Sequence, residues 1–325
     1  MLPRSAPYRP TRSPLPGRPE RRLNPAVRLG LLLTLLAIAK TALAEDPTAE
    51  FLRGLLDRGL YRVAENEAIR RLDDPLLKPH EKVTWSIGLA QAYLRHAHAM
   101  NGSDRESLAA KAEQKLADLL RVSPPLPRQP QIRTQQALFT AERAEMLVWD
   151  FQQWGGDRQR TAAVDSLQAA ATVLRDVRSQ LDTDVRAAAR RSDQDEADGE
   201  LTAGEIRRLQ RELDVQLARS LTSLVEIVPD GPERTSALRE ADQRLQTLAD
   251  GWIGELRTWE ARLLRARLAR LRGENGQAAG IIRAALEDQP ARWLAERFIA
   301  EQVRTLLADG KIDLALQTLL DETRS

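Results

Sequence analysis

A fixed spacing from glycine to alanine recurs at the turns of three helical hairpins in this sequence. Gly59, Gly273 and Gly310 are each followed five residues later by an alanine, and the last two glycines are 37 residues apart. The alanines are Ala64, Ala278 and Ala315. Glycine permits the left-handed backbone of a tight turn, and alanine lets two helices approach closely. A unit that recurs at such a period is typical of a solenoid of helical pairs.

The segment ARLLRARLARLRGENGQAAGIIRAALEDQP shows the pattern most clearly. Leu264, Leu268 and Leu271 share one helical face before Gly273, and the apolar face resumes after the turn. Similar segments, separated by short turns, continue from residue 46 to the end. We therefore expect an all-α chain of about twelve helices in six antiparallel hairpins, without strands. The helices of residues 130–250 are expected to be longer and less regular.

These hairpins resemble the tetratricopeptide repeat family, which places small and large residues at fixed points and ends the unit with proline. The residues that carry the resemblance are Ala266, Gly273, Ala278, Ile282, Ala285 and Pro290. Ala112 begins the same spacing in an earlier hairpin, through Leu116, Leu119 and Pro124. The resemblance implies a right-handed superhelix whose concave face binds a peptide or protein. The alternative is a helical bundle without repeats.

The first 44 residues have the features of a secretory signal behind a basic leader. Arg21, Arg22 and Arg28 precede the apolar residues 29–39, and Ala42-Leu43-Ala44 fits a cleavage site after Ala44. The alternative is an uncleaved membrane anchor. This region carries eight basic residues and one acidic residue, a net +7. Since the whole chain is +2, the rest is −5, which argues against nucleic-acid binding. We predict an exported, periplasmic or extracellular protein.

An acidic segment, SDQDEADGEL, spans residues 192–201 and divides the predicted array into residues 45–191 and 202–325. Aligned on Gly199, it offers Asp198 and Glu205 at two positions of a calcium-binding loop. The earlier ligand positions fall on Gln194 and Glu196, so any calcium affinity should be weak. Thr202 and Glu205 also satisfy the capping-box rule, which predicts a helix starting at Ala203.

No residue pattern indicates catalysis or a cofactor. The chain has no cysteine and three histidines, of which His96 and His98 point in different directions on a helix. No phosphate-binding loop or nucleophile elbow is present. The Arg-rich segment around residues 257–272 is interpreted as an exposed amphipathic face. The tryptophans are expected mainly in the core, with one or two in a binding groove: Trp149, Trp154, Trp252, Trp259 and Trp293.

The function expected from the sequence is a non-enzymatic scaffold that binds a protein or peptide partner. Two alternatives remain open: a helical enzyme that acts on polysaccharide or cell wall, and a structural protein that self-associates. The last helix is apolar at Ile312, Leu316, Leu319 and Leu320, where a solenoid normally has a polar cap. Either this helix packs wholly on its neighbour, or it needs a partner, which includes self-association, or the chain is a fragment of a longer array.

Overall fold

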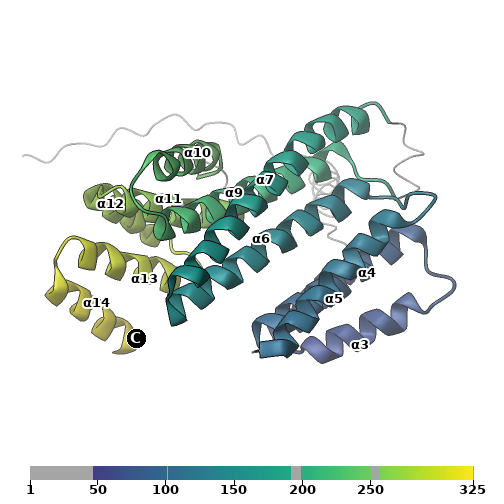
Figure 1. Cartoon of the computed structure of the whole chain (residues 1–325), viewed down its shortest axis with the longest axis horizontal. Helices are drawn as coiled ribbons and strands as arrows, with labels where there is room; N and C mark the ends of the chain where they lie inside the picture. Colours follow the sequence, from purple (N-terminus) through teal and green to yellow (C-terminus); the bar gives the residue numbers. More distant parts are fainter. Residues whose placement is uncertain (1–46, 101, 192–198, 250–255, 325) are drawn as a thin grey trace, which may run out of the picture. The chain divides into compact units, whose positions relative to one another are not determined.

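A computed structural model describes residues 47–100, 102–191, 199–249 and 256–324. In these residues the chain forms twelve α-helices and no strand, as the sequence predicts (Figure 1). The helices are α2 (Pro47–Asp57), α3 (Tyr61–Leu72), α4 (Pro79–His98), α5 (Gly102–Arg121), α6 (Gln129–Trp154), α7 (Asp157–Ala188), α9 (Ala203–Ile227), α10 (Pro232–Ala249), α11 (Leu256–Leu271), α12 (Asn275–Glu287), α13 (Arg292–Ala308) and α14 (Ile312–Arg324). The predicted signal sequence lies outside the described residues.

Three of the turns between helices have the same geometry. Gly59, Gly273 and Gly310 have φ values of +71°, +80° and +71°. In each turn, the residue after the glycine donates its backbone N–H to the carbonyl five residues earlier. These bonds are Leu60 to Leu55 at 3.0 Å, Glu274 to Ala269 at 2.9 Å and Lys311 to Leu306 at 2.9 Å. This is the Schellman arrangement, which satisfies carbonyls left free at the end of a helix.

Each helix that follows a turn within a hairpin contains a buried alanine, which lies near the start of most of these helices and in the middle of α5. Ala64, Ala278 and Ala315, five residues after the turn glycines, are buried. Ala112, Ala163 and Ala237 are buried in α5, α7 and α10 as well. A methyl side chain leaves room for the backbone of the neighbouring helix, so these residues allow successive helices to pack closely.

The helices pack in two alternating series. From α3 to α14, each described helix contacts the next one along the chain. In addition, α4, α6, α9, α11 and α13 each contact the next member of that series. Leu52 of α2 packs against Gly88 of α4, where a Cβ atom would overlap the leucine, so α2 belongs with them. We call these six helices series A. The other six described helices, each of which follows a series A helix along the chain, are series B.

The hydrophobic core follows this order instead of forming one centre. One cluster joins α2, α3 and α4, and a second joins α4, α5 and α6. The largest extends from α6 to α11, and the fourth joins α11, α12 and α13. Leu201 belongs to the largest cluster, so the core is continuous beside the acidic segment.

The middle helices are longer than the others, as expected from the sequence. α6, α7 and α9 contain 26, 32 and 25 residues. The pattern of successive and alternate contacts nevertheless continues through them. Within the described residues, no helix is both long enough and apolar enough to cross a bilayer.

Two glycines near the α11–α12 turn provide a test of this geometry, because alanine should have opposite effects at them. Gly273 has a positive φ, so Gly273→Ala should lower stability by about 1 kcal/mol, although no atom obstructs the new methyl group. Gly280 is exposed inside α12, and Gly280→Ala should raise stability by about 0.5–1 kcal/mol. Urea unfolding followed by circular dichroism measures both. Equal shifts of the two midpoints would contradict the left-handed turn.

Candidate binding surface

A row of ion pairs links three helices of series A. Arg219 of α9 lies 3.1 Å from Glu260 of α11, and Arg257 of α11 lies 2.8 Å from Glu212 of α9. Further along, Arg267 of α11 pairs with Glu226 of α9. We define the ionic row as these residues together with Arg270 of α11 and Arg297 and Glu301 of α13. Three of the pairs join α9 to α11 at successive positions along the two helices, and Arg270 continues the row to Glu301 of α13.

The far end of the row is the most deeply buried. The Arg270 Nε atom donates to Glu301 Oε1 at 2.6 Å, and their side chains are 14% and 2% exposed. Arg267 donates to both carboxylate oxygens of Glu226, one bond being 2.6 Å long. A bidentate bond of this kind fixes the relative orientation of the two helices. Removing one member would leave the other charge partly buried without its partner, which is costly.

The charges in and near the ionic row shift the pKa values of its members. Burial opposes ionisation of Glu226, but hydrogen bonds and the charges of Arg267 and Arg270 outweigh it and lower the pKa of Glu226. Arg297 has an exposed side chain on α13, where burial of its guanidinium group and the nearby charge of Arg219 lower its pKa. The coupling of Arg297 to α9 and α11 places it on the same surface as the ion pairs.

Two glutamates of α6 continue the polar surface. Ser223 of α9 donates its hydroxyl to Glu145 Oε2 at 2.9 Å, while Glu145 Oε1 is buried without a hydrogen-bond partner among the described residues. Burial raises the pKa of Glu145, although the Ser223 bond and two nearby arginines act in the opposite direction. Burial also raises the pKa of Glu142, one helical turn earlier. Between α6 and α9, therefore, the neutral carboxyl form is favoured.

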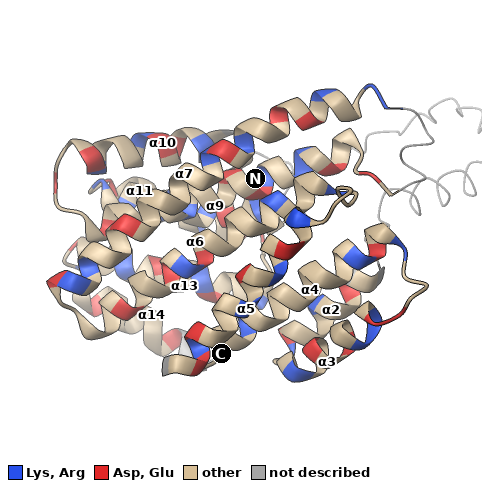
Figure 2. Cartoon of the chain, turned by 45° about the vertical axis from the view of Figure 1, so that its right-hand side comes forward, with Lys and Arg blue, Asp and Glu red and all other residues tan. Residues whose placement is uncertain are grey.

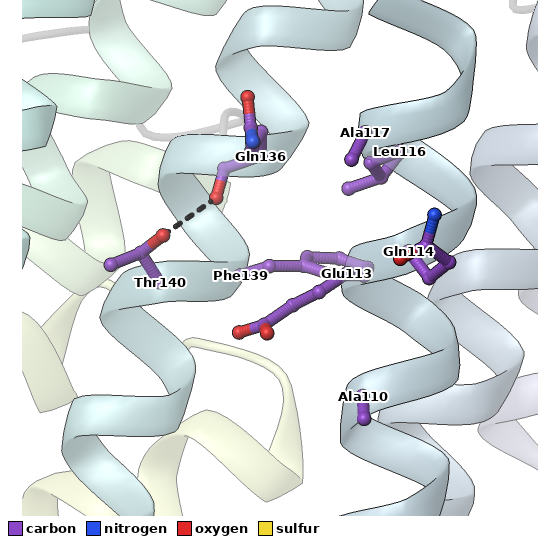
Figure 3. Close-up of a pocket in the computed structure, with 8 residues that line it drawn as sticks. All are labelled: Ala110, Glu113, Gln114, Leu116, Ala117, Gln136, Phe139 and Thr140. Carbon is purple, nitrogen blue, oxygen red and sulfur yellow. Dashed lines mark hydrogen bonds between the residues drawn. The ribbon is translucent and has the colours of Figure 1, made fainter.

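A cavity of about 490 Å³ lies between α5 and α6 (Figure 3). Its lining includes Phe139, Leu116 and Gln114, and the Glu113 side chain extends into the gap between the two helices. Glu113 pairs with Arg143 at 2.7 Å, and both side chains are exposed. The carboxylate in this cavity is therefore solvent-exposed and already paired with an arginine.

A second cavity, of about 500 Å³, lies where α7, α9 and α10 meet. Asp214 accepts from Arg178 at 3.1 Å and from Arg244 at 2.8 Å. Glu240 pairs with Arg175 at 2.7 Å. Acidic and basic groups therefore neutralise one another in this cavity, and its lining does not include the α6 glutamates.

The residues that carry the repeat resemblance lie at turns and in helix contacts. Ala266, Ile282 and Ala285 are buried in one cluster that joins α11, α12 and α13. Pro290 lies between α12 and α13. The glycines and the remaining alanines are those of the turns and close contacts described above. These residues shape the fold and do not form a ligand site.

Only the end of the acidic segment belongs to the described residues, and Asp198 lies outside them. The Thr202 backbone N–H donates to Glu205 Oε2 at 2.8 Å, and the Glu205 N–H donates to Thr202 Oγ1 at 3.2 Å. This reciprocal bonding confirms the predicted capping box and the helix start at Ala203. The Gly199 carbonyl accepts from Arg128 Nε at 3.0 Å. Glu205 and Gly199 thus serve local structure.

The histidines do not form a metal site in the described part of the chain, where no group of three potential ligands occurs. His96 Nδ1 lies 2.7 Å from Glu65 Oε1 and its ring stacks on Tyr61. The pairing joins α4 to α3 and explains the position of His96 without a metal. Burial lowers the pKa of His98, so its neutral form is favoured.

The expectation that the tryptophans lie mainly in the core is wrong for most of those described. Trp259 is buried and packs edge to face on Phe298. Trp149, Trp154 and Trp293 are exposed, and Arg105 lies 5.9 Å from the Trp149 ring centre. Trp252 lies outside the described residues. Helical spacing alone does not show which face of a helix a neighbouring hairpin will cover.

The Arg-rich segment is not the exposed amphipathic face expected from the sequence. Arg267 and Arg270 are largely buried and paired with glutamates of α9 and α13. Arg262 pairs with Asp288 at 2.6 Å and lies over the Trp259 ring. The ionic row is not evident in the sequence because its paired residues are 31 to 45 residues apart. In the sequence, the alternation of Arg and Leu in α11 was the signal that could have indicated the ionic row.

Comparisons with models of known protein families, with curated proteins and with solved structures found no match. Figure 2 shows acidic and basic residues interspersed along the helices. Because no match was found, the described surfaces of this chain are the only basis for its proposed function.

The raised pKa of Glu145 gives a pH-dependent prediction. Between the ordinary glutamate value of 4.5 and the raised pKa, the folded state binds more protons than the unfolded state, so stability falls as pH rises. Glu145→Gln keeps a partner for Ser223 and removes the charge. It should be more stable than the wild type above this range and equal to it below pH 4.5. A tenfold weaker ionisation in the folded state corresponds to about 1.4 kcal/mol. Urea unfolding at a series of pH values measures the difference.

Glu226→Gln is the matched control, because the pKa of Glu226 is lowered. The stability that this ion pair contributes is present above pH 4.5 and is lost as pH falls through the lowered pKa. The variant should therefore be less stable by about 2 kcal/mol at neutral pH, with the difference shrinking in acid. If the two variants changed stability in the same direction at neutral pH, the assigned electrostatics would be wrong.

Proposed function

We propose that this chain is an exported, tetratricopeptide-like solenoid of six hairpins, and that it binds a protein or peptide across the surface of series A. The proposed superhelix is right-handed, and series A lines its concave side. In this arrangement the ionic row lies along the binding groove. The observation that carries the proposal is that three neighbouring series A helices, α9, α11 and α13, are joined by a row of charged side chains.

The packing order supports the solenoid. A unit that contacts only its neighbours along the chain is the defining property of repeat proteins. Here, helix contacts join successive helices or successive members of series A, and the core clusters follow the same order. The three identical glycine turns, near both ends of the chain, support a common unit.

The chemistry of the series A surface supports a polypeptide partner. Helices arranged side by side offer a long surface with regularly spaced side chains, which suits an extended or helical segment. The ionic row supplies both signs of charge, and Arg297 adds a further positive charge that is influenced by two other arginines. Such mixed charge suits a polar partner with its own acidic and basic groups, because complementary charges fix the register of an interface.

Export is proposed from the first 44 residues alone. The basic residues, the apolar segment 29–39 and the small residues before Ala44 form the sequence argument. The partner is accordingly expected among exported proteins.

Site-specific photocrosslinking tests the binding surface. A photoreactive amino acid at Arg297, beside the ionic row, should capture a defined partner from the exported fraction. The control replaces Arg239 on α10 of series B, an exposed arginine away from the row. Mass spectrometry of the adducts should identify the same partner repeatedly at position 297 and not at position 239. The same adducts at both positions, or none at position 297, would contradict the proposal.

A further inference from the structure

The last described helix carries an exposed apolar stripe. Ile312, Leu316, Leu319 and Leu320 follow the spacing of one helical face on α14. Each is about half exposed, between 46% and 59%. Leu307, near the end of α13, is 52% exposed. We call these five residues the α14 stripe; they belong to the yellow hairpin of Figure 1.

Comparison with the sequence of the first hairpin identifies which face of the last hairpin carries the α14 stripe. Residues 49–64 and 300–315 share the pattern A-E-x-x-R-x-L-L-x-x-G-x-x-x-x-A, with an offset of 251 residues. Leu307 therefore corresponds to Leu56, and Leu319 to Ala68. Both hairpins also have the same glycine turn. The two units can consequently be compared position by position.

In the first hairpin, these positions are covered by the following helix. Leu56 is 6% exposed and Ala68 is fully buried, in a cluster with Trp85 and Leu89 of α4. Their counterparts Leu307 and Leu319 are 52% and 46% exposed. Leu316 corresponds to Glu65, which bonds to His96 of α4. The α14 stripe thus includes the face that hairpins of this chain use to stack, and no described helix covers it.

The size of the stripe argues for a macromolecular contact. Five large side chains at half exposure present on the order of 450 Å² of apolar surface, which is within the range of about 300–600 Å² for the largest, often functional, patch on a monomer. Two such surfaces would bury about 900 Å² together before any contribution from their polar rim. This approaches the area of about 1,000 Å² that a specific interface requires.

At the opposite end of the described chain, α2 exposes one large apolar side chain, Phe51, and no apolar stripe. In α13, Glu301 and Thr305 are buried against the preceding hairpin. At the same offset, the corresponding residues of α2 are Glu50, an exposed carboxylate, and Gly54. A polar position and a missing side chain are poor partners for leucines. The stripe of another molecule is apolar over the same length and matches it residue for residue.

We propose that the α14 stripe packs against the α14 stripe of a second copy of this chain about a two-fold axis. The contact is isologous, so each stripe supplies both sides of the interface and the assembly closes as a dimer. It replaces the cover that α4 provides for the first hairpin. The dimer leaves the ionic row of each copy outside the contact, so this proposal does not depend on the proposed partner binding.

Sedimentation equilibrium of the purified full chain over a wide concentration range tests the dimer. Leu316→Glu places a carboxylate in the stripe, next to its symmetry mate, and should raise the dissociation constant at least about a hundredfold. Leu314→Glu is the control, since Leu314 is equally exposed on another face of the same helix. It should leave the dissociation constant nearly unchanged. Circular dichroism should show the same helix content in both variants.

Crosslinking provides a second readout, because the chain has no cysteine. With a short bis-maleimide reagent, Leu316→Cys should give covalent dimers and Leu314→Cys should not. A wild type that stays monomeric at every concentration would overturn the proposal, as would a dimer that Leu316→Glu and Leu314→Glu weaken equally. A monomer whose stripe instead captures a different protein would also overturn it.

Discussion

The structure depends on the close approach of two helices across a small side chain, immediately after a turn that reverses the chain. A buried alanine in each series B helix brings it against the helix before it. Once two helices lie this close, their outer faces form one surface on which the next hairpin packs. The separate core clusters follow from this order, because each hairpin buries its apolar side chains only against its neighbours.

Contacts along series A differ in kind from those between the series. Between α9, α11 and α13, ion pairs accompany the apolar contacts, with Arg267 and Arg270 of α11 bonded to glutamates on either side. Because both partners are partly buried, these pairs add less net stability than leucines of similar size would. Their directional bonds instead fix how far one hairpin is rotated against the next. The ion pairs therefore give α9, α11 and α13 a polar surface and hold these helices in register.

The number and type of the helices could be predicted from the sequence, because apolar periodicity and glycine turns act locally. The turn geometry at Gly59, Gly273 and Gly310 could be predicted for the same reason. The five-residue spacing from glycine to alanine did not predict the close contacts in the middle of the chain. There, Ala163 and Ala237 lie seven and six residues after their turn glycines, Gly156 and Gly231. The ionic row could not be predicted, because its pairs depend on the length of each hairpin and on the rotation between hairpins. Exposure of the tryptophans depends on the same rotation.

The first and last described hairpins differ in the faces that the other described helices leave exposed. Toward the start of the described residues, the exposed Glu50 occupies the position that is buried as Glu301 in α13, and Phe51 beside it is the one large apolar side chain that α2 exposes. In the last hairpin, Leu307 and Leu319 keep apolar side chains at positions that α4 covers in the first. If stacking alone determined these residues, both ends would be equally apolar. A leucine stripe at one end therefore requires a cover that the packing of the twelve described helices does not supply.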